Sequence, residues 1–234
     1  MPSLSMKKAL KDIYTRLADH YGPTRWWPGD SPFEVAVGAI LTQNTAWSNV
    51  EKAIVNLKRE RLLTPRRMMD APLADLEEAI RPSGYYRQKA ERLRIFCAFL
   101  LRGYRGRMSL LMTRPLAELR EALLALKGIG PETADDMLLY ACEKPVFVVD
   151  AYTIRIFHRA GLVAEDIRYE ALQRLVHEHL TPALHLYKEF HGLLVWTGKD
   201  YCRKTPRCEG CPLAVPGVPG RPFPCHKDLS YTLC

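Results

Sequence analysis

The sequence predicts an all-α protein, and three observations support this fold class. Apolar residues recur at helical spacing in nearly every segment of the 234-residue chain. The clear β-like run, residues 146–149, is so short that it suits an extended connector better than a sheet strand. Glycine and proline clusters separate the periodic segments, as loops between helices do. With 47% hydrophobic residues, the chain can bury a real core.

The helices follow from these patterns in chain order. Residues 5–20 carry an amphipathic pattern, and the proline-punctuated residues 21–32 indicate a loop. Residues 33–44 are apolar nearly all round, which predicts a buried helix. Further helices are expected near residues 47–60, 65–70, 73–80, 86–102, 115–125, 131–142, 150–160, 165–179 and 182–196. Residues 205–224 contain six prolines, so something other than a helix or a hydrophobic core must order this tail.

The charge and the N-terminal segment narrow the choice of partner and compartment. A net charge of +8 favours a polyanionic partner, nucleic acid before a membrane, although a merely basic enzyme is the plainer alternative. The N-terminal segment has no continuous apolar core and is not a signal peptide, and no run of 18 apolar residues exists to span a membrane. We expect a monomeric cytoplasmic protein, nucleoid-associated in a bacterium.

The cysteines divide into two groups. Five of the seven lie at or after position 202, whereas Cys97 and Cys142 sit in apolar helical patterns and are expected to pack in the core. A Cys-x-x-Cys pair with flanking cysteines is typical of a metal site in a cytosolic protein, and metal binding would order the proline-rich tail. The candidate ligands are Cys202, Cys208, Cys211 and Cys225, a set that suits either zinc or an iron–sulfur cluster.

The stretch "LKGIGPETAD" at residues 126–135 predicts a tight turn between two helices. Gly128 and Gly130 permit backbone angles closed to other residues, and Pro131 suits the first turn of a helix. Because the free N–H groups of such a turn attract a phosphate oxygen, we expect an αα-hairpin that presents backbone donors to DNA. An ordinary glycine-capped helix end is the alternative.

Asp150 follows an apolar run and precedes a helical pattern, which predicts a helix N-cap. A capping carboxylate beside a helix N-terminus stays ionised at neutral pH. Its fixed negative charge can stabilise a cation or orient a water molecule, unless the residue caps the helix and does nothing more.

The hairpin stretch, the stretch "VVDAYTIRIFHRAGL" and the cysteine motif together resemble the helix-hairpin-helix (HhH-GPD) DNA glycosylases of the endonuclease III superfamily, over about residues 33–211. The resemblance implies two helical domains with a DNA-binding cleft between them. Residues 25–144 would form a six-helix barrel-type domain with the hairpin, and residues 1–24 plus 145–234 would carry the catalytic aspartate and the cluster loop. Asp150 matches that aspartate, which stabilises the oxocarbenium-like sugar after the damaged nucleotide is flipped out of double-stranded DNA.

The residue at position 132 bears on the type of glycosylase. Bifunctional members of the family carry a lysine there, which attacks the sugar and forms a Schiff base. This chain has Glu132, and a carboxylate cannot form an imine, so we expect a monofunctional enzyme without β-lyase activity. Lys127 and Lys144 do not match the motif position, and whether either substitutes for the missing lysine stays open.

The stretches "RWWPGD" and "LTQNTAWS" are similar to those that form the base pocket in the 3-methyladenine branch of the family. Trp27 and Trp47 match the residues that sandwich the base there, Trp26 lies beside them, and Glu132 matches an acidic residue of that branch. Alkylated purines are cationic, and indole faces attract cations by about 0.5–2 kcal/mol. Core packing of the tryptophans is the alternative.

The stretch "SGYYRQKAERLR" resembles the minor-groove wedge loop of the family. Tyr85 would intercalate where the base leaves, while Arg87 and Lys89 would hold phosphates, unless they form a merely solvated helix face. Gln43 matches the residue that fills the gap opposite the flipped base. The remaining expected DNA contacts are Asn44, Gly128, Gly130 and Thr133.

The family resemblance implies a structural [4Fe-4S] cluster with four cysteine ligands. The gaps between the cysteines are five, two and thirteen residues, whereas the family pattern has six, two and five. The long last gap leaves the fourth ligand open, with Cys225 as the first choice and Cys234 or His226 behind it. Zinc is the alternative metal. Basic residues of this region are expected to face DNA phosphates, namely Lys199, Arg203, Lys204 and Arg207.

Three rival functions remain at this point. One is a glycosylase for oxidised or deaminated bases, another a catalytically silent DNA-damage binding protein, and the third a cluster-dependent redox sensor. Replacing Asp150 by asparagine separates the first two from each other, since only an enzyme loses base release. A redox sensor would bind DNA differently in its oxidised and reduced states.

Overall fold

A computed structural model of the chain describes residues 5–214, and within this range the protein is all-helical, as the sequence predicts. The helices are α1 (Met6–Tyr21), α2 (Pro32–Leu41), α3 (Trp47–Arg59), α4 (Pro65–Asp70), α5 (Leu73–Ile80), α6 (Tyr86–Tyr104), α7 (Met108–Met112), α8 (Leu116–Leu124), α9 (Pro131–Asp136), α10 (Ala151–Arg159), α11 (Tyr169–His179) and α12 (Leu184–Asp200). Two short segments complete them, the 3-10 turn η1 (Arg81–Ser83) and the π-helical turn η2 (Met137–Ala141).

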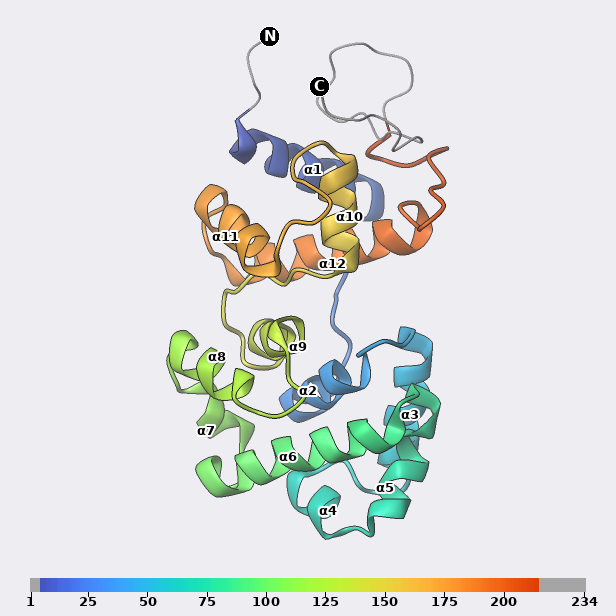
Figure 1. The fold of residues 1–234 in the computed structure, drawn as a ribbon, viewed down its shortest axis with the longest axis vertical. Helices are drawn as coiled ribbons and strands as arrows, with labels where there is room; N and C mark the ends of the chain where they lie inside the picture. Colours follow the sequence, from blue (N-terminus) through green and yellow to red (C-terminus); the bar gives the residue numbers. More distant parts are fainter. Residues whose placement is uncertain (1–4, 215–234) are drawn as a thin grey trace. The chain divides into compact units, whose positions relative to one another are not determined.

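The chain divides into two compact units, residues 1–26 with 147–234, and residues 27–146. In the first unit, α12 packs against α10 and α1, and α11 packs against α1 (Figure 1). Its core contains the buried aromatic side chains Phe147, Phe157, Tyr187 and Phe190. None of the helices in the described part of the chain combines the length and apolar character that crossing a bilayer requires.

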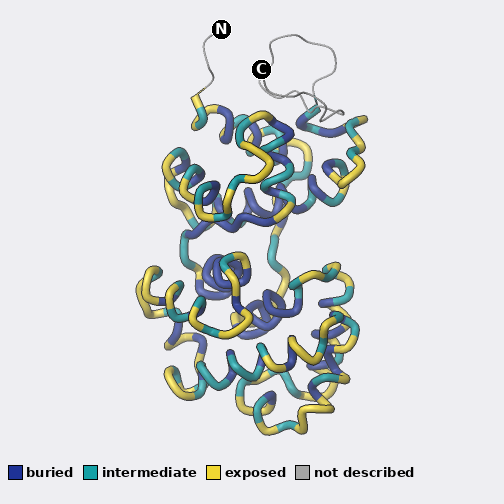
Figure 2. Tube along the Cα trace, in the orientation of Figure 1, coloured by how far each residue is buried: buried dark blue, intermediate teal, exposed yellow. Residues whose placement is uncertain are grey.

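In the second unit, α2 is the central helix. Nine of its residues are buried, and it packs against α3, α6, α9 and η2 (Figure 2). The long helix α6 lies between α2 and the two short helices α4 and α5, and it packs against all three (Figure 1). A helix that is apolar all round needs neighbours on every side, so this burial confirms the prediction made from residues 33–44.

Most helix boundaries agree with the periodicity of the sequence, and the differences have local causes. The short helix α7 was not predicted, because five residues are too few for periodicity to show. Helix α11 begins at Tyr169 rather than 165, since the preceding residues form a turn. Residues 146–149 are extended and buried and form no strand, which confirms the predicted connector.

Candidate functional site

The predicted αα-hairpin is present between α8 and α9. Gly128 has φ +87°, a left-handed conformation that glycine adopts without strain, and Gly130 caps α9 ahead of Pro131. A Cβ atom at Gly128 would overlap the side chain of Arg92, whereas one at Gly130 would meet no atom within 4 Å. The turn is thus packed against α6 at Gly128 and open at Gly130, which is exposed.

Gln43 connects the end of α2 to this hairpin. Its amide nitrogen donates to the carbonyl of Gly128 at 3.1 Å and to the hydroxyl of Thr133 at 2.9 Å. The guanidinium of Arg92 donates to the amide oxygen of Gln43. The neighbouring Asn44 is exposed, with φ +54°. Both ends of the Gln43 amide are therefore engaged within the protein.

Tyr85 and Arg87 are both exposed at the start of α6. Tyr85 precedes α6, has φ +47°, and its side chain is 65% exposed. Arg87 is exposed on the first turn of α6, with its guanidinium 5.9 Å from the ring of Tyr86. This geometry is compatible with the wedge and phosphate roles expected for the two residues.

Lys89 requires a correction. Its side chain is buried, and its ammonium donates to the carbonyls of Leu41 at 2.8 Å and Ser83 at 2.7 Å. Burial, with the charge of Arg92 adding to it, lowers the pKa of Lys89 to about 8. This placement contradicts the expectation that Lys89 holds a DNA phosphate. The residue instead joins the end of α2 to the η1 turn, which precedes Tyr85.

Trp27 and Trp47 lie together, but not as parallel plates. Their ring centroids are 5.1 Å apart with planes crossing at 85°, and Tyr140 of η2 lies 5.3 Å from Trp27 on centroid distance. Gly38 allows the Trp27 ring to lie on α2, because a Cβ atom there would come within 3.2 Å of the indole nitrogen. The edge-to-face contact leaves no space for a base between the two rings, so stacking a base there requires one ring to turn.

Three acidic side chains are among the residues that line a pocket next to these indoles. The pocket has a volume of about 320 Å³, and its lining includes Trp27, Trp47, Asp30, Glu34 and Glu51 beside apolar residues such as Ile54 and Val55. Glu51 accepts a hydrogen bond from the indole nitrogen of Trp47 at 2.9 Å. One cation, Lys58, lies 2.7 Å from both Asp30 and Glu34. With three carboxylates facing one ammonium, the pocket keeps a negative potential beside aromatic faces, which suits a cationic ligand.

Asp150 is the N-cap of α10, as the sequence predicts. One carboxylate oxygen accepts hydrogen bonds from the N–H of Thr153 at 2.7 Å and from its hydroxyl at 2.8 Å. The other oxygen lies 3.8 Å from the imidazole of His191, a buried residue of α12. Burial by itself raises the pKa of Asp150. The His191 imidazole and the Thr153 hydrogen bonds outweigh burial, so the pKa lies below its ordinary value of 3.8 and the carboxylate stays ionised.

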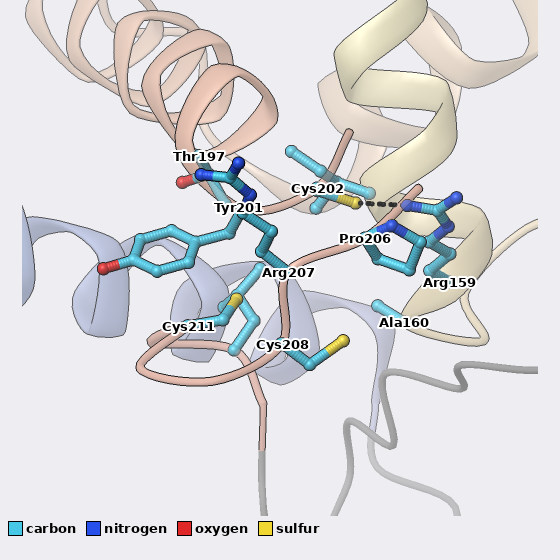
Figure 3. A pocket seen from close by; sticks show the side chains of 11 residues that line it. Arg159, Ala160, Thr197, Tyr201, Cys202, Pro206, Arg207, Cys208 and Cys211 are labelled. Atoms are coloured by element: carbon cyan, nitrogen blue, oxygen red, sulfur yellow. Dashed lines mark hydrogen bonds between the residues drawn. The ribbon is translucent and has the colours of Figure 1, made fainter. Parts of the chain in front are cut away.

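Three of the predicted metal ligands line one pocket at the end of α12. Cys202 and Cys211 are buried, and Cys208 is half-buried (Figure 3). Arg159 donates to the sulfur of Cys202 at 3.3 Å, and also to the carbonyls of Arg203 and Lys204. Arg159 thus places a positive charge against the sulfur of Cys202 and ties this sulfur to the segment that follows α12.

The fourth predicted ligand, Cys225, lies outside the described residues, as do its alternatives Cys234 and His226. Among residues 5–214, no three His, Cys, Asp or Glu side chains are arranged as they stand to hold a metal ion. The three sulfurs around one pocket fit a thiolate-bound centre in kind, because soft metals and iron–sulfur clusters take cysteine ligands.

The remaining site candidates are placed as follows. Glu132 is exposed in the first turn of α9, and the ammonium of Lys127 lies 2.8 Å from Glu91. Trp26 belongs to the first unit, with the ammonium of Lys199 5.0 Å from its ring centroid.

Sequence reasoning missed the structural partners of the site, His191, Arg92 and Arg159. The signal available for His191 was an isolated polar residue in the apolar stretch "FHGLLVW".

Known proteins similar to this chain include DNA repair enzymes. A family model described as the HhH-GPD superfamily of base excision DNA repair proteins matches residues 37–182. A protein of Methanocaldococcus jannaschii named as a DNA repair glycosylase is 44% identical over 202 residues, covering 86% of this chain and 92% of that protein. Endonuclease III of Thermotoga maritima is 34% identical, over 77% of this chain and 79% of its own length.

A solved structure is also similar to this chain. The 3-methyladenine DNA glycosylase of Helicobacter pylori, crystallised with 1,N6-ethenoadenine, is 33% identical and superposes with a TM-score of 0.71. The match covers 84% of this chain and 98% of that one.

Proposed function

The chain belongs to the HhH-GPD superfamily of base excision DNA repair proteins and is a DNA glycosylase, and from this premise we propose that it is a monofunctional enzyme for alkylated purines of the 3-methyladenine kind. The observation that carries the substrate proposal is the acidic pocket beside Trp27 and Trp47. A purine alkylated on a ring nitrogen is cationic, and both indole faces and carboxylates attract a cation. The similarity to a 3-methyladenine DNA glycosylase supports the same substrate class.

Asp150 is proposed as the catalytic carboxylate. Loss of a cationic base leaves positive charge on the sugar, and an ionised carboxylate nearby stabilises that charge. Thr153 holds one of its oxygens, so the other, which lies 3.8 Å from the His191 imidazole, is the one proposed to face the sugar or the attacking water. A cationic base is already a good leaving group, so the enzyme needs no protonated acid to assist its departure.

The absence of lyase activity is proposed from position 132. A carboxylate there cannot attack the sugar carbon as an amine does, so water attacks and an abasic site is released with the strand intact. Lys127 lies 2.8 Å from Glu91. That ion pair must open before the amine can act, which supports water as the nucleophile.

We also propose that Cys202, Cys208 and Cys211 hold a [4Fe-4S] cluster, with Cys225 as the first choice for the fourth ligand and zinc as the alternative metal. When bound, the centre would supply structural cross-linking of the tail rather than a chemical step. Arg159 would stabilise the thiolate of Cys202. Iron and sulfide analysis, together with a visible absorption band, distinguishes the cluster from zinc.

The substrate proposal is tested on alkylated DNA. Duplex DNA treated with a methylating agent is incubated with the protein, and released bases are identified by mass spectrometry. We expect methylated purines, with release abolished by Asp150→Asn and retained by Asp166→Asn, an exposed carboxylate of the same unit. Binding of the duplex should survive in both variants. Release of oxidised or deaminated bases alone would favour the rival glycosylase class, and unchanged turnover in Asp150→Asn would contradict the catalytic assignment.

Borohydride trapping tests the absence of a lyase. The wild-type protein should give no covalent complex with substrate DNA, because a Schiff base requires an amine at the sugar. Glu132→Lys places an amine at the motif position and is expected to become trappable. Trapping of the wild-type protein would overturn the monofunctional assignment.

A further inference from the structure

One polar chain in the second unit joins α6 to the hairpin turn and to the end of α2. The Gln43 amide nitrogen binds the Gly128 carbonyl at 3.1 Å and the Thr133 hydroxyl at 2.9 Å. The guanidinium of Arg92, on α6, donates to the amide oxygen of Gln43. Because Arg92 fixes the oxygen, the amide nitrogen is oriented toward the hairpin, so the three segments are held in one arrangement.

Arg92 also fills the space beneath the turn. A Cβ atom on Gly128 would overlap the Nε, Cγ and Cδ atoms of Arg92, which shows how closely the side chain passes under the glycine. At the rim of the turn, Lys127 and Glu91 form an ion pair at 2.8 Å that also joins the turn to α6. A glycine turn has many conformations of similar energy, so it needs such support to keep one of them.

We infer that Arg92 is a positioning residue for DNA binding, which locks Gln43 onto the hairpin turn so that the two meet DNA as one preformed surface. The inference rests on the proposed function as a DNA glycosylase and on the expectation from the sequence that the hairpin and Gln43 contact DNA. A surface ordered before it binds loses less conformational entropy on binding, and affinity rises accordingly. Gln43 then acts through the turn that it holds, and its effect on binding depends on Arg92.

Two simpler roles for these residues give different behaviour. If Arg92 were a plain phosphate contact, its loss would weaken binding independently of Gln43 and lower the salt slope by about one. If Gln43 were an unsupported side chain that inserts into DNA alone, the binding free energies lost in the two single variants would also add in the double variant. Positioning predicts instead that either loss removes the same interaction.

A double-mutant cycle on the full chain tests the inference. Binding of an undamaged duplex is measured by fluorescence anisotropy at several salt concentrations for Arg92→Leu, Gln43→Ala and the double variant. We expect the Kd of each single variant to rise about tenfold. The Kd of the double variant should be no more than about twofold above that of the weaker-binding single variant. Arg102→Leu removes the same charge from an exposed position of α6 and serves as the control.

The inference is overturned if the fold losses in affinity of the two single variants multiply in the double variant, or if Arg92→Leu binds DNA as tightly as Arg102→Leu. Should Arg92→Leu be unfolded at the assay temperature, Arg92→Lys repeats the cycle, since it keeps the charge and the aliphatic stem but loses the planar fork. The readout is binding, not base release. Failure of base release from methylated DNA would therefore overturn the proposed substrate while leaving this cycle interpretable.

Discussion

Asp150 and Thr153 form a closed pair at the start of α10, in which one carboxylate oxygen takes both the N–H and the hydroxyl of Thr153, at 2.7 and 2.8 Å. These two hydrogen bonds complete the N-cap of α10. The other carboxylate oxygen of Asp150 faces the imidazole of His191. A residue that would cap a helix in any protein thereby becomes a fixed, ionised carboxylate. Capping and the proposed catalytic role depend on the same hydrogen bonds.

The first prediction concerns the Thr153 hydroxyl. Thr153→Val removes one hydrogen bond to the ionised carboxylate, so the pKa of Asp150 should rise. The ionised form exists above that pKa and is lost as pH falls through it. The acid limb of kcat/KM for base release should therefore move to higher pH, while duplex binding stays unchanged. Thr153→Ser keeps a hydroxyl and should retain the wild-type profile; an unshifted limb in Thr153→Val would contradict the prediction.

The second prediction concerns the arginine behind the cysteine pocket. Arg159→Lys cannot donate at once to the Cys202 sulfur and to the carbonyls of Arg203 and Lys204, because a single ammonium lacks the planar fork. We expect a loss of about 1–3 kcal/mol in stability and a lower metal content per chain as purified. Thermal unfolding and metal analysis measure both. Arg168→Lys, at an exposed position, is the control, and equal metal content in the two variants would argue against a role for Arg159 at the cysteine pocket.

The sequence predicts the local features of this protein well, because they depend on nearby residues. Helical periodicity locates most helices, and the residues around Asp150 predict its N-cap. The edge-to-face packing of Trp27 on Trp47 and the burial of Lys89 depend on how separate helices pack, and no local pattern carries that information. The phosphate contact inferred for Lys89 from the family's wedge loop and its alternative, a solvated helix face, both required an exposed side chain.

The third prediction concerns the buried ion pair that closes the hairpin. Arg120 of α8 binds Asp135 of α9 through two hydrogen bonds of 2.8 and 3.1 Å, and Asp135 is fully buried. Arg120→Met leaves that carboxylate without the guanidinium and should cost about 3–5 kcal/mol of unfolding free energy. The double variant Arg120→Met/Asp135→Leu removes both charges and should recover most of the loss. Chemical denaturation of the wild type, Arg120→Met, Asp135→Leu and the double variant measures this, and a double variant as unstable as the sum of the two single variants would contradict this account.

The fourth prediction uses the depressed pKa of Lys89, about 8 in the folded protein against an ordinary value of 10.5. At neutral pH the ammonium is charged in both states, and its burial opposes folding. Between pH 8 and 10.5 the unfolded chain holds this proton more strongly than the folded protein does. The contribution of Lys89 to the free energy of unfolding therefore rises across that window. It stays constant above the window, where the side chain is neutral in both the folded and the unfolded protein.

Lys89→Met isolates this effect, since the other titrating groups are common to both proteins. The difference in unfolding free energy between wild-type and variant should move in favour of the wild type as pH rises from about 8 to 10.5. Chemical denaturation at several pH values in this range measures the difference. A flat difference for Lys89→Met would contradict the burial of its ammonium between the carbonyls of Leu41 and Ser83.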